Sequence, residues 1–165
     1  MATQINIDTS EMRQFFEKLG GAKEDFQKEM QQWLEGLGND FLTTVQEEIM
    51  RRQVMDTRLL LASFQKGAEG NVWSMTDGGL TLEVGTNVKY ADWVENGHRQ
   101  QPGRFVPGHW SGDRFIYSPG ASEGMVLKSS WVEGKHYFES AVRIIEAMMP
   151  SYMEAKMNQW LSKYF

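Results

Sequence analysis

The sequence predicts an α+β fold in which long helices flank a small, mainly antiparallel sheet. Apolar residues recur every three or four positions across residues 23–51 and again across 135–161, which is the spacing of amphipathic helices. Between these segments, the turn Asp77-Gly78-Gly79 separates two strand-like stretches, which indicates a hairpin. Helices that are segregated from hairpin strands along the chain are typical of the α+β class.

The N-terminal part, residues 1–52, is predicted to be helical. Residues 8–10 (Asp-Thr-Ser) are N-cap types ahead of a first short helix, which Gly20-Gly21 would end. A second helix is expected from about Lys23 to Arg51, with Gly36 and Gly38 weakening or bending it. We interpret the charged residues at its end, Glu47, Glu48, Arg51 and Arg52, as solvated. Its apolar stripe consists of Phe26, Met30, Trp33, Leu34, Leu37, Phe41, Val45 and Ile49.

The middle part, residues 53–134, is predicted to contain the sheet. A short helix over residues 57–65 precedes the hairpin, whose strands are residues 71–76 and 80–86. One or two helical turns follow at residues 90–95, closed by Asn96-Gly97 as a C-cap. Glycines and prolines then predict a long loop over residues 98–114. Further strands are expected in the stretches RFIYS and MVLKSSWV.

The last part, residues 135–165, is predicted to be one amphipathic helix. It starts near Lys135 or His136, and Pro150 would kink it or split it in two. With 165 residues, the chain is long enough for a single domain with its own core. The wide apolar faces of both long helices suggest that other subunits cover part of them.

Composition excludes several classes of protein. The chain is 41% hydrophobic and 24% charged, and it has no cysteine, so disulfides and thiol catalysis are excluded. We find no signal peptide and no apolar run long enough for a membrane span, so a cytosolic origin is expected. The net charge of −5 is unfavourable for a dedicated nucleic-acid binder. No sequence pattern calls for a cofactor.

The segment that follows residue 97 has three possible functions. A metal-dependent hydrolase would use His98 and His109 with an acid such as Asp92 or Glu95, but the three histidines are 11 and 27 residues apart and form no HExxH. A nucleic-acid module would use the arginines at positions 99, 104 and 114, with aromatic residues between them. Arginine and aromatic residues are also the types enriched at protein–protein interfaces, and this third interpretation fits the composition best.

Two motifs resemble those of a known family. Residues 84–99, VGTNVKYADWVENGHR, resemble the pattern V-G-[ST]-x-x-x-Y-A-x-x-[VL]-E-x-G-[TH]-R of the HK97 gp10-like family of tailed-phage neck and tail-completion proteins. Residues 56–64, DTRLLLASF, resemble the family's T-G-x-L-x-x-S-[FI] segment, although Arg58 stands where glycine is usual. The stretch KHYF from Lys135 is similar to the entry to the family's last helix.

The resemblance implies a structural protein of the virion neck or tail that joins head and tail and carries out no reaction. It also implies a ring of the chain's own copies, with a hexamer as one candidate, and contacts with an adaptor, a tail terminator or a tail tube. A tail-terminator role is the alternative within this class. DNA would only pass through the lumen, no membrane would be involved, and the protein would reside in the host cytoplasm before assembly.

Under this hypothesis, residues 98–114 would project from the subunit and dock on a neighbouring subunit or ring. Tyr90 and Trp93 would form a buried face, with core packing as the simpler explanation, and Glu95 and Arg99 could form an ion pair. The interface is predicted to consist of Tyr90, Trp93, Glu95, His98, Arg99, Arg104, Phe105, Trp110 and Arg114.

Overall fold

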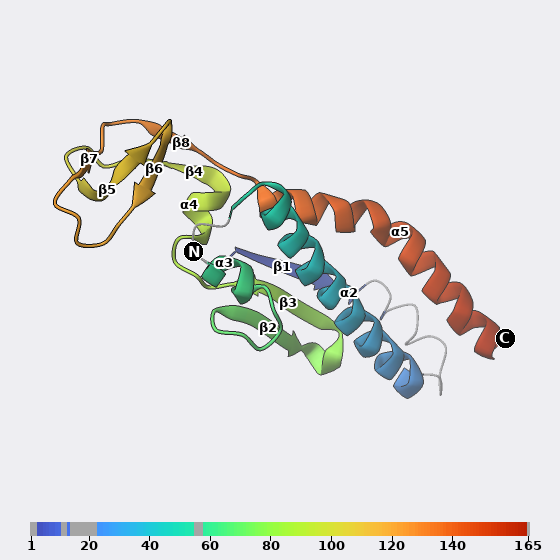
Figure 1. The fold of residues 1–165 in the computed structure, drawn as a ribbon. Helices are drawn as coiled ribbons and strands as arrows, with labels where there is room; N and C mark the ends of the chain where they lie inside the picture. The colour runs from blue at the N-terminus through green and yellow to red at the C-terminus, as the bar shows by residue number, and fades with distance from the viewer. Residues whose placement is uncertain (1–2, 11–12, 14–22, 55–57, 165) are drawn as a thin grey trace.

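The α+β class is confirmed by a computed structural model, which describes residues 3–10, 13, 23–54 and 58–164. Two long helices, α2 (Lys23–Arg51) and α5 (Tyr137–Tyr164), pack against each other. The other side of α2 faces a three-stranded antiparallel sheet, so α2 lies between α5 and the sheet (Figure 1). The first predicted short helix falls almost wholly outside the described residues.

The predicted hairpin forms the centre of that sheet. Strands β2 (Asn71–Thr76) and β3 (Thr81–Thr86) pair antiparallel and are joined by a short 3-10 turn, η1 (Asp77–Gly79). Strand β1 (Thr3–Asp8) was not predicted and completes the order β1-β3-β2. Its sequence TQINID alternates apolar and polar residues, which indicates a strand. The N-cap residues that follow it favoured a helical N-terminal part instead.

The core lies where α2, α5 and the sheet meet. The predicted apolar stripe of α2 is confirmed, because all its members are buried except Trp33, which is partly buried. The rings of Phe41 and Phe138 meet edge to face, with centroids 5.2 Å apart. The expected half-buried strand is also confirmed, since Leu82 and Val84 of β3 belong to this core.

The two glycines of α2 have different structural roles. A Cβ on Gly38 would lie 2.5 Å from Leu82 Cδ2 and 2.7 Å from the Trp73 ring, so the helix packs closely against the sheet at this residue. Gly36 is exposed, and a Cβ there would meet nothing within 4 Å. Gly38 is therefore needed for packing, whereas Gly36 only lowers helix propensity.

Alanine substitutions are expected to act in opposite directions at these two positions. Gly38→Ala should lower the free energy of unfolding by about 1–3 kcal/mol, because it overpacks the helix–sheet contact. Gly36→Ala should raise it by up to about 1 kcal/mol, because alanine is the better helix former. Urea denaturation of the two variants measures both effects. Equal changes at both positions would contradict the close approach at Gly38.

The remaining predicted helices are confirmed. Helix α3 (Arg58–Ser63) precedes the hairpin, and α4 (Ala91–Asn96) follows it. Helix α4 ends at Gly97, as expected, but its φ of 80° and ψ of 169° lie outside the left-handed helical region of the usual glycine C-cap. Pro150 does not split the last helix, because α5 is one element from Tyr137 to Tyr164. No helix among the described residues is both long and apolar enough to cross a membrane.

The prediction of a long loop over residues 98–114 was wrong, because this segment is largely β-structure. The strands of this segment and of the residues that follow it are β4 (Gly97–Arg99), β5 (Phe105–Ser111), β6 (Arg114–Tyr117), β7 (Gly124–Val126) and β8 (Trp131–Glu133). Strand β4 pairs with β8, and a separate sheet has the order β6-β5-β7. The predicted strand MVLKSSWV is thus divided between two sheets. We call residues 97–133 the arm, which projects from one end of the helix pair (Figure 1).

Candidate interaction site

The arm exposes most of the large apolar side chains that reach solvent. Within the described residues, the stretch from Trp93 to Val132 contains eight of the twelve large apolar side chains that are exposed. Gly108, which has no side chain, is the single buried residue among residues 98–133. A β-structure of this kind has no core of its own. The exposed set in this stretch is Trp93, Phe105, Trp110, Ile116, Tyr117, Val126, Trp131 and Val132.

Aromatic rings lying over glycines hold the arm together instead. A Cβ on Gly124 would lie 2.6 Å from Phe105 Cζ, and one on Gly108 would lie 2.7 Å from Phe115 Cζ. Gly108 also has a φ of 155°, in the region that favours glycine. An aromatic side chain that covers a strand glycine compensates for the missing side chain. The arm therefore keeps its shape without burying a cluster of side chains.

The outer face of the arm is apolar with cationic edges. Phe105 of β5 stands opposite Val126 of β7, and residues that are directly opposite share a face of the sheet. Both side chains are exposed. Arg104 and Lys128, which flank this pair along the chain, are exposed as well. We call these four residues the Phe105 face.

The base of the arm is fixed by a buried carboxylate. Glu95, at the end of α4, accepts a hydrogen bond from the backbone N–H of Phe138 at 2.9 Å on one oxygen. Its other oxygen accepts one from the N–H of Glu139, also at 2.9 Å. The first N–H groups of a helix have no intrahelical partner, and the helix dipole favours a negative charge there. Glu95 therefore caps α5 from a position more than 40 residues earlier in the chain.

Two glycines allow the backbone segments at this base to touch. A Cβ on Gly134 would clash with the carbonyl oxygen of Glu95, and one on Gly97 would lie 2.5 Å from the carbonyl oxygen of Val132. The N–H of Lys135 donates to the carbonyl of Val94 at 2.8 Å, and that of His136 donates to the carbonyl of Glu95 at 3.1 Å. We call this contact between α4, the ends of the arm and the start of α5 the junction.

A second carboxylate ties the end of α2 to the same region. The prediction that the charged residues at the end of α2 are solvated was wrong for Glu48, which is buried and bonded to both Arg51 and Arg52. Arg52 also donates to the carbonyl oxygen of Lys135 at 2.7 Å. Hydrogen bonds to Glu48, the one from Arg51 first among them, outweigh its desolvation and lower its pKa from 4.5 to about 2.

This pKa shift predicts a pH-dependent contribution to stability. Because the pKa of Glu48 is lower in the folded chain, its contribution is fully present above about pH 5 and is lost as the pH falls from 4.5 towards 2. We expect about 1–3 kcal/mol, less than the full shift gives because Arg51 is open to solvent. The difference in unfolding free energy between the wild type and Glu48→Gln should therefore shrink on acidification. Glu47→Gln, at an exposed neighbour, should show little difference at any pH.

The structure brings only some of the predicted interface residues to the surface. The core interpretation was wrong for Trp93, whose side chain is 59% exposed, whereas Tyr90 is partly buried against the core. Glu95 forms no ion pair with Arg99, since its oxygens bind the backbone of α5. His98 is half-buried at the base of the arm, and its ring lies 5.8 Å from that of Trp93. Besides Trp93, the exposed members are Arg99, Arg104, Phe105, Trp110 and Arg114.

A hollow of about 680 Å³ separates the base of the arm from the body of the protein. Its lining includes Trp93, His98 and Val132, together with Arg114 at the start of β6. The Nδ1 atom of His98 is buried and has no hydrogen-bond partner among the described residues. Apolar and charged side chains thus share the lining of the hollow, with Glu133 and Lys135 among the charged ones.

The hydrolase alternative receives no support from the positions of the histidines. Among the described residues, the group whose ligand atoms lie close enough to hold a metal consists of Glu95, His136 and Glu139, without His98 or His109. Both oxygens of Glu95 already accept backbone N–H groups, and the positive end of a helix dipole disfavours a cation. This group is therefore better explained as a helix cap.

An exposed apolar surface such as that of the arm is typical of proteins that bind other proteins. The comparison with protein families agrees, because residues 10–97 match the model described as "Bacteriophage HK97-gp10, putative tail-component". The match covers just over half of the chain, and the chain belongs to this HK97-gp10-like family of bacteriophage tail components. The expected family membership is thus confirmed.

Two relatives from Bacillus subtilis (strain 168) match most of the chain. The phage-like element PBSX protein XkdI is 46% identical over 140 residues, which cover 84% of this chain and 87% of XkdI. Protein YqbI is 42% identical over 160 residues, which cover 92% of this chain and 96% of YqbI. No solved structure matches the chain significantly. The family and these relatives support a structural role in a phage tail or neck.

Proposed function

We propose that the chain completes the tail of a phage or phage-like particle and joins it to the head, as a ring of its own copies. The observation that carries this proposal is the arm, whose large side chains are exposed although the strands themselves are regular. Apolar area of this extent is stable in water only when another protein covers it. The similarity to XkdI, a protein of a phage-like element, supports a particle of this kind.

The shape of the chain favours a ring over a symmetric dimer. The arm projects from the end where α2 finishes and α5 begins, whereas the other ends of both helices lie at the opposite end of the molecule (Figure 1). Contacts between different ends of identical subunits are head-to-tail, and such contacts form a ring when the rotation closes. The two axial faces of the ring would meet the neighbouring neck and tail proteins, and DNA would pass through the lumen.

Deletion of the gene in the phage-like element that encodes the chain tests this role. We expect electron microscopy to show separate heads and tails in the deletion strain, and joined particles once the wild-type gene is restored. Tails of irregular length with intact joints would instead identify a tail terminator. Particles that are joined normally without the chain would refute the proposal.

Variants in the same complementation assay test the contribution of the arm. Val126→Asp places a charge in the Phe105 face and should fail to restore joined particles. Leu59→Asp is the matched control, because Leu59 is a comparably exposed apolar residue on α3, outside the arm. Both variants should fold, since both side chains are exposed. Equal complementation by the two variants would contradict a role for the arm.

A further inference from the structure

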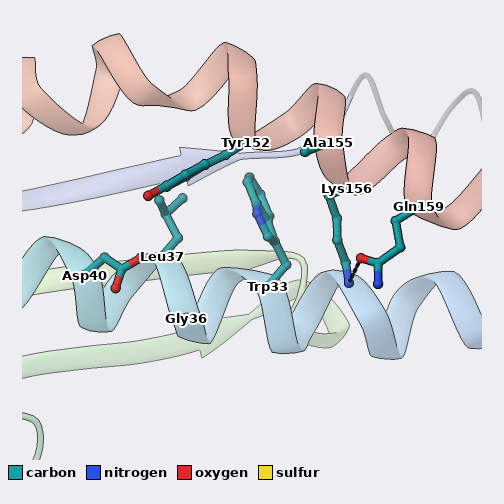
Figure 2. A pocket seen from close by; sticks show the side chains of 8 residues that line it. All are labelled: Trp33, Gly36, Leu37, Asp40, Tyr152, Ala155, Lys156 and Gln159. Atoms are coloured by element: carbon teal, nitrogen blue, oxygen red, sulfur yellow. Dashed lines mark hydrogen bonds between the residues drawn. The ribbon is translucent and has the colours of Figure 1, made fainter.

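A groove between the two long helices is the second apolar feature of the surface. It has a volume of about 340 Å³ and lies between the middle of α2 and the second half of α5 (Figure 2). Trp33 and Leu37 extend from α2 towards α5, and Tyr152 extends from α5 towards α2 (Figure 2). Gly36 leaves the α2 wall without a side chain, and a Cβ there would meet nothing within 4 Å. The groove is therefore open to a bulky apolar group.

Acidic residues flank this groove. Asp40 lines it, and Glu47 lies two turns further along the same face of α2; both side chains are exposed. Helix α2 has seven acidic and three basic residues, a net charge of −4. Lys156 also lines the groove, but its ammonium group lies 3.7 Å from the carboxylate of Glu29. An apolar group with cationic neighbours would fit this surface.

The Phe105 face of the arm has that chemistry. Phe105 and Val126 provide an apolar centre, and Arg104 and Lys128 provide positive charge on either side. The arm as a whole has four basic and three acidic residues, a net charge of +1 in a chain of net charge −5. The two surfaces are thus complementary in both polarity and charge.

The arm cannot reach the groove of its own chain. It projects from the end of the helix pair and points away from the groove, which lies along the α2–α5 seam (Figure 1). A contact between the two surfaces therefore joins two copies. We infer that the α2–α5 groove receives the Phe105 face of the arm of a second copy, as the head-to-tail contact of the ring. This inference rests on the proposed ring assembly and specifies its interface.

Disulfide cross-linking tests the contact, because the chain has no cysteine of its own. Assembled particles or purified rings that contain Val126→Cys together with Gly36→Cys should form a ladder of covalent oligomers under mild oxidation. The combination of Val126→Cys with Leu59→Cys is the control and should give none, because Leu59 lies on α3, away from the groove. Each single cysteine variant should also give none.

The outcomes separate the inference from the proposed function. Rings that form without the Val126–Gly36 cross-link would refute the groove contact and leave the ring role standing. A protein that forms no oligomer, in particles or in solution, would refute both. Arg104→Glu, which changes the Phe105 face, should weaken self-association by about tenfold. Asp40→Arg, which changes the groove, should have a similar effect. An unchanged association constant in both charge variants would also count against the inference.

Discussion

Glu95→Ala is expected to lower the free energy of unfolding by about 2–4 kcal/mol, because it leaves one buried and one partly buried N–H donor at the start of α5 without an acceptor. Both donors, from Phe138 and Glu139, now bind the carboxylate at 2.9 Å. Glu95→Gln keeps one acceptor oxygen and should lose roughly half as much. Chemical denaturation measures both losses.

Asp92→Ala provides the control for this experiment. Asp92 is an acidic residue of the same short helix, and its carboxylate accepts a hydrogen bond from the Asn96 side chain at an exposed position. Its replacement should change the free energy of unfolding by less than about 0.5 kcal/mol. If Glu95→Ala were as mild as Asp92→Ala, the capping role of Glu95 would be wrong.

Gly134→Ala is expected to lower the free energy of unfolding about as much as Glu95→Ala does, although it removes no interaction. The added Cβ would clash with the carbonyl oxygen of Glu95, and backbone atoms cannot move aside as a flexible side chain can. We expect a loss of about 3 kcal/mol or a displacement of the arm from the junction. Hydrogen exchange distinguishes the two results, because displacement would expose the N–H groups of Lys135 and His136, which now donate to Val94 and Glu95.

Gly36→Ala is again the suitable control, since its Cβ is unobstructed. It should leave exchange at the junction unchanged. Faster exchange at Lys135 and His136 in this control would mean that the junction responds to general changes in stability. Normal stability and normal exchange in Gly134→Ala would contradict the close backbone contact.

The elements that the sequence predicts well are those with local signals. The bounds of α2 and the hairpin follow from periodicity and from a turn of three residues, which are both properties of neighbouring positions. The cap at Glu95 could not be found in this way, because its partners lie 43 and 44 residues away. Likewise, Gly36 and Gly38 look alike in the sequence, and only the sheet that approaches from Leu82 and Trp73 separates them.

The arm was misread because its strands use residues that normally interrupt strands. Pro107 lies within β5, and Gly108 and Gly124 lie beneath aromatic rings. In a strand that has a buried face, such residues would be unfavourable. In an arm without a core, they are tolerated because Phe105 and Phe115 supply the missing contacts. The composition of the segment thus predicts its exposed aromatic and cationic side chains better than it predicts the conformation of its backbone.

The arm leaves the body and returns to it at one point, because Gly97 pairs with Glu133 and the next residue, Gly134, touches the backbone of Glu95. A segment whose two ends adjoin can change in length with little effect on the chain that carries it. The family match ends at residue 97, where the arm begins. Replacing the arm with the corresponding segment of a related protein should therefore leave the helical body folded.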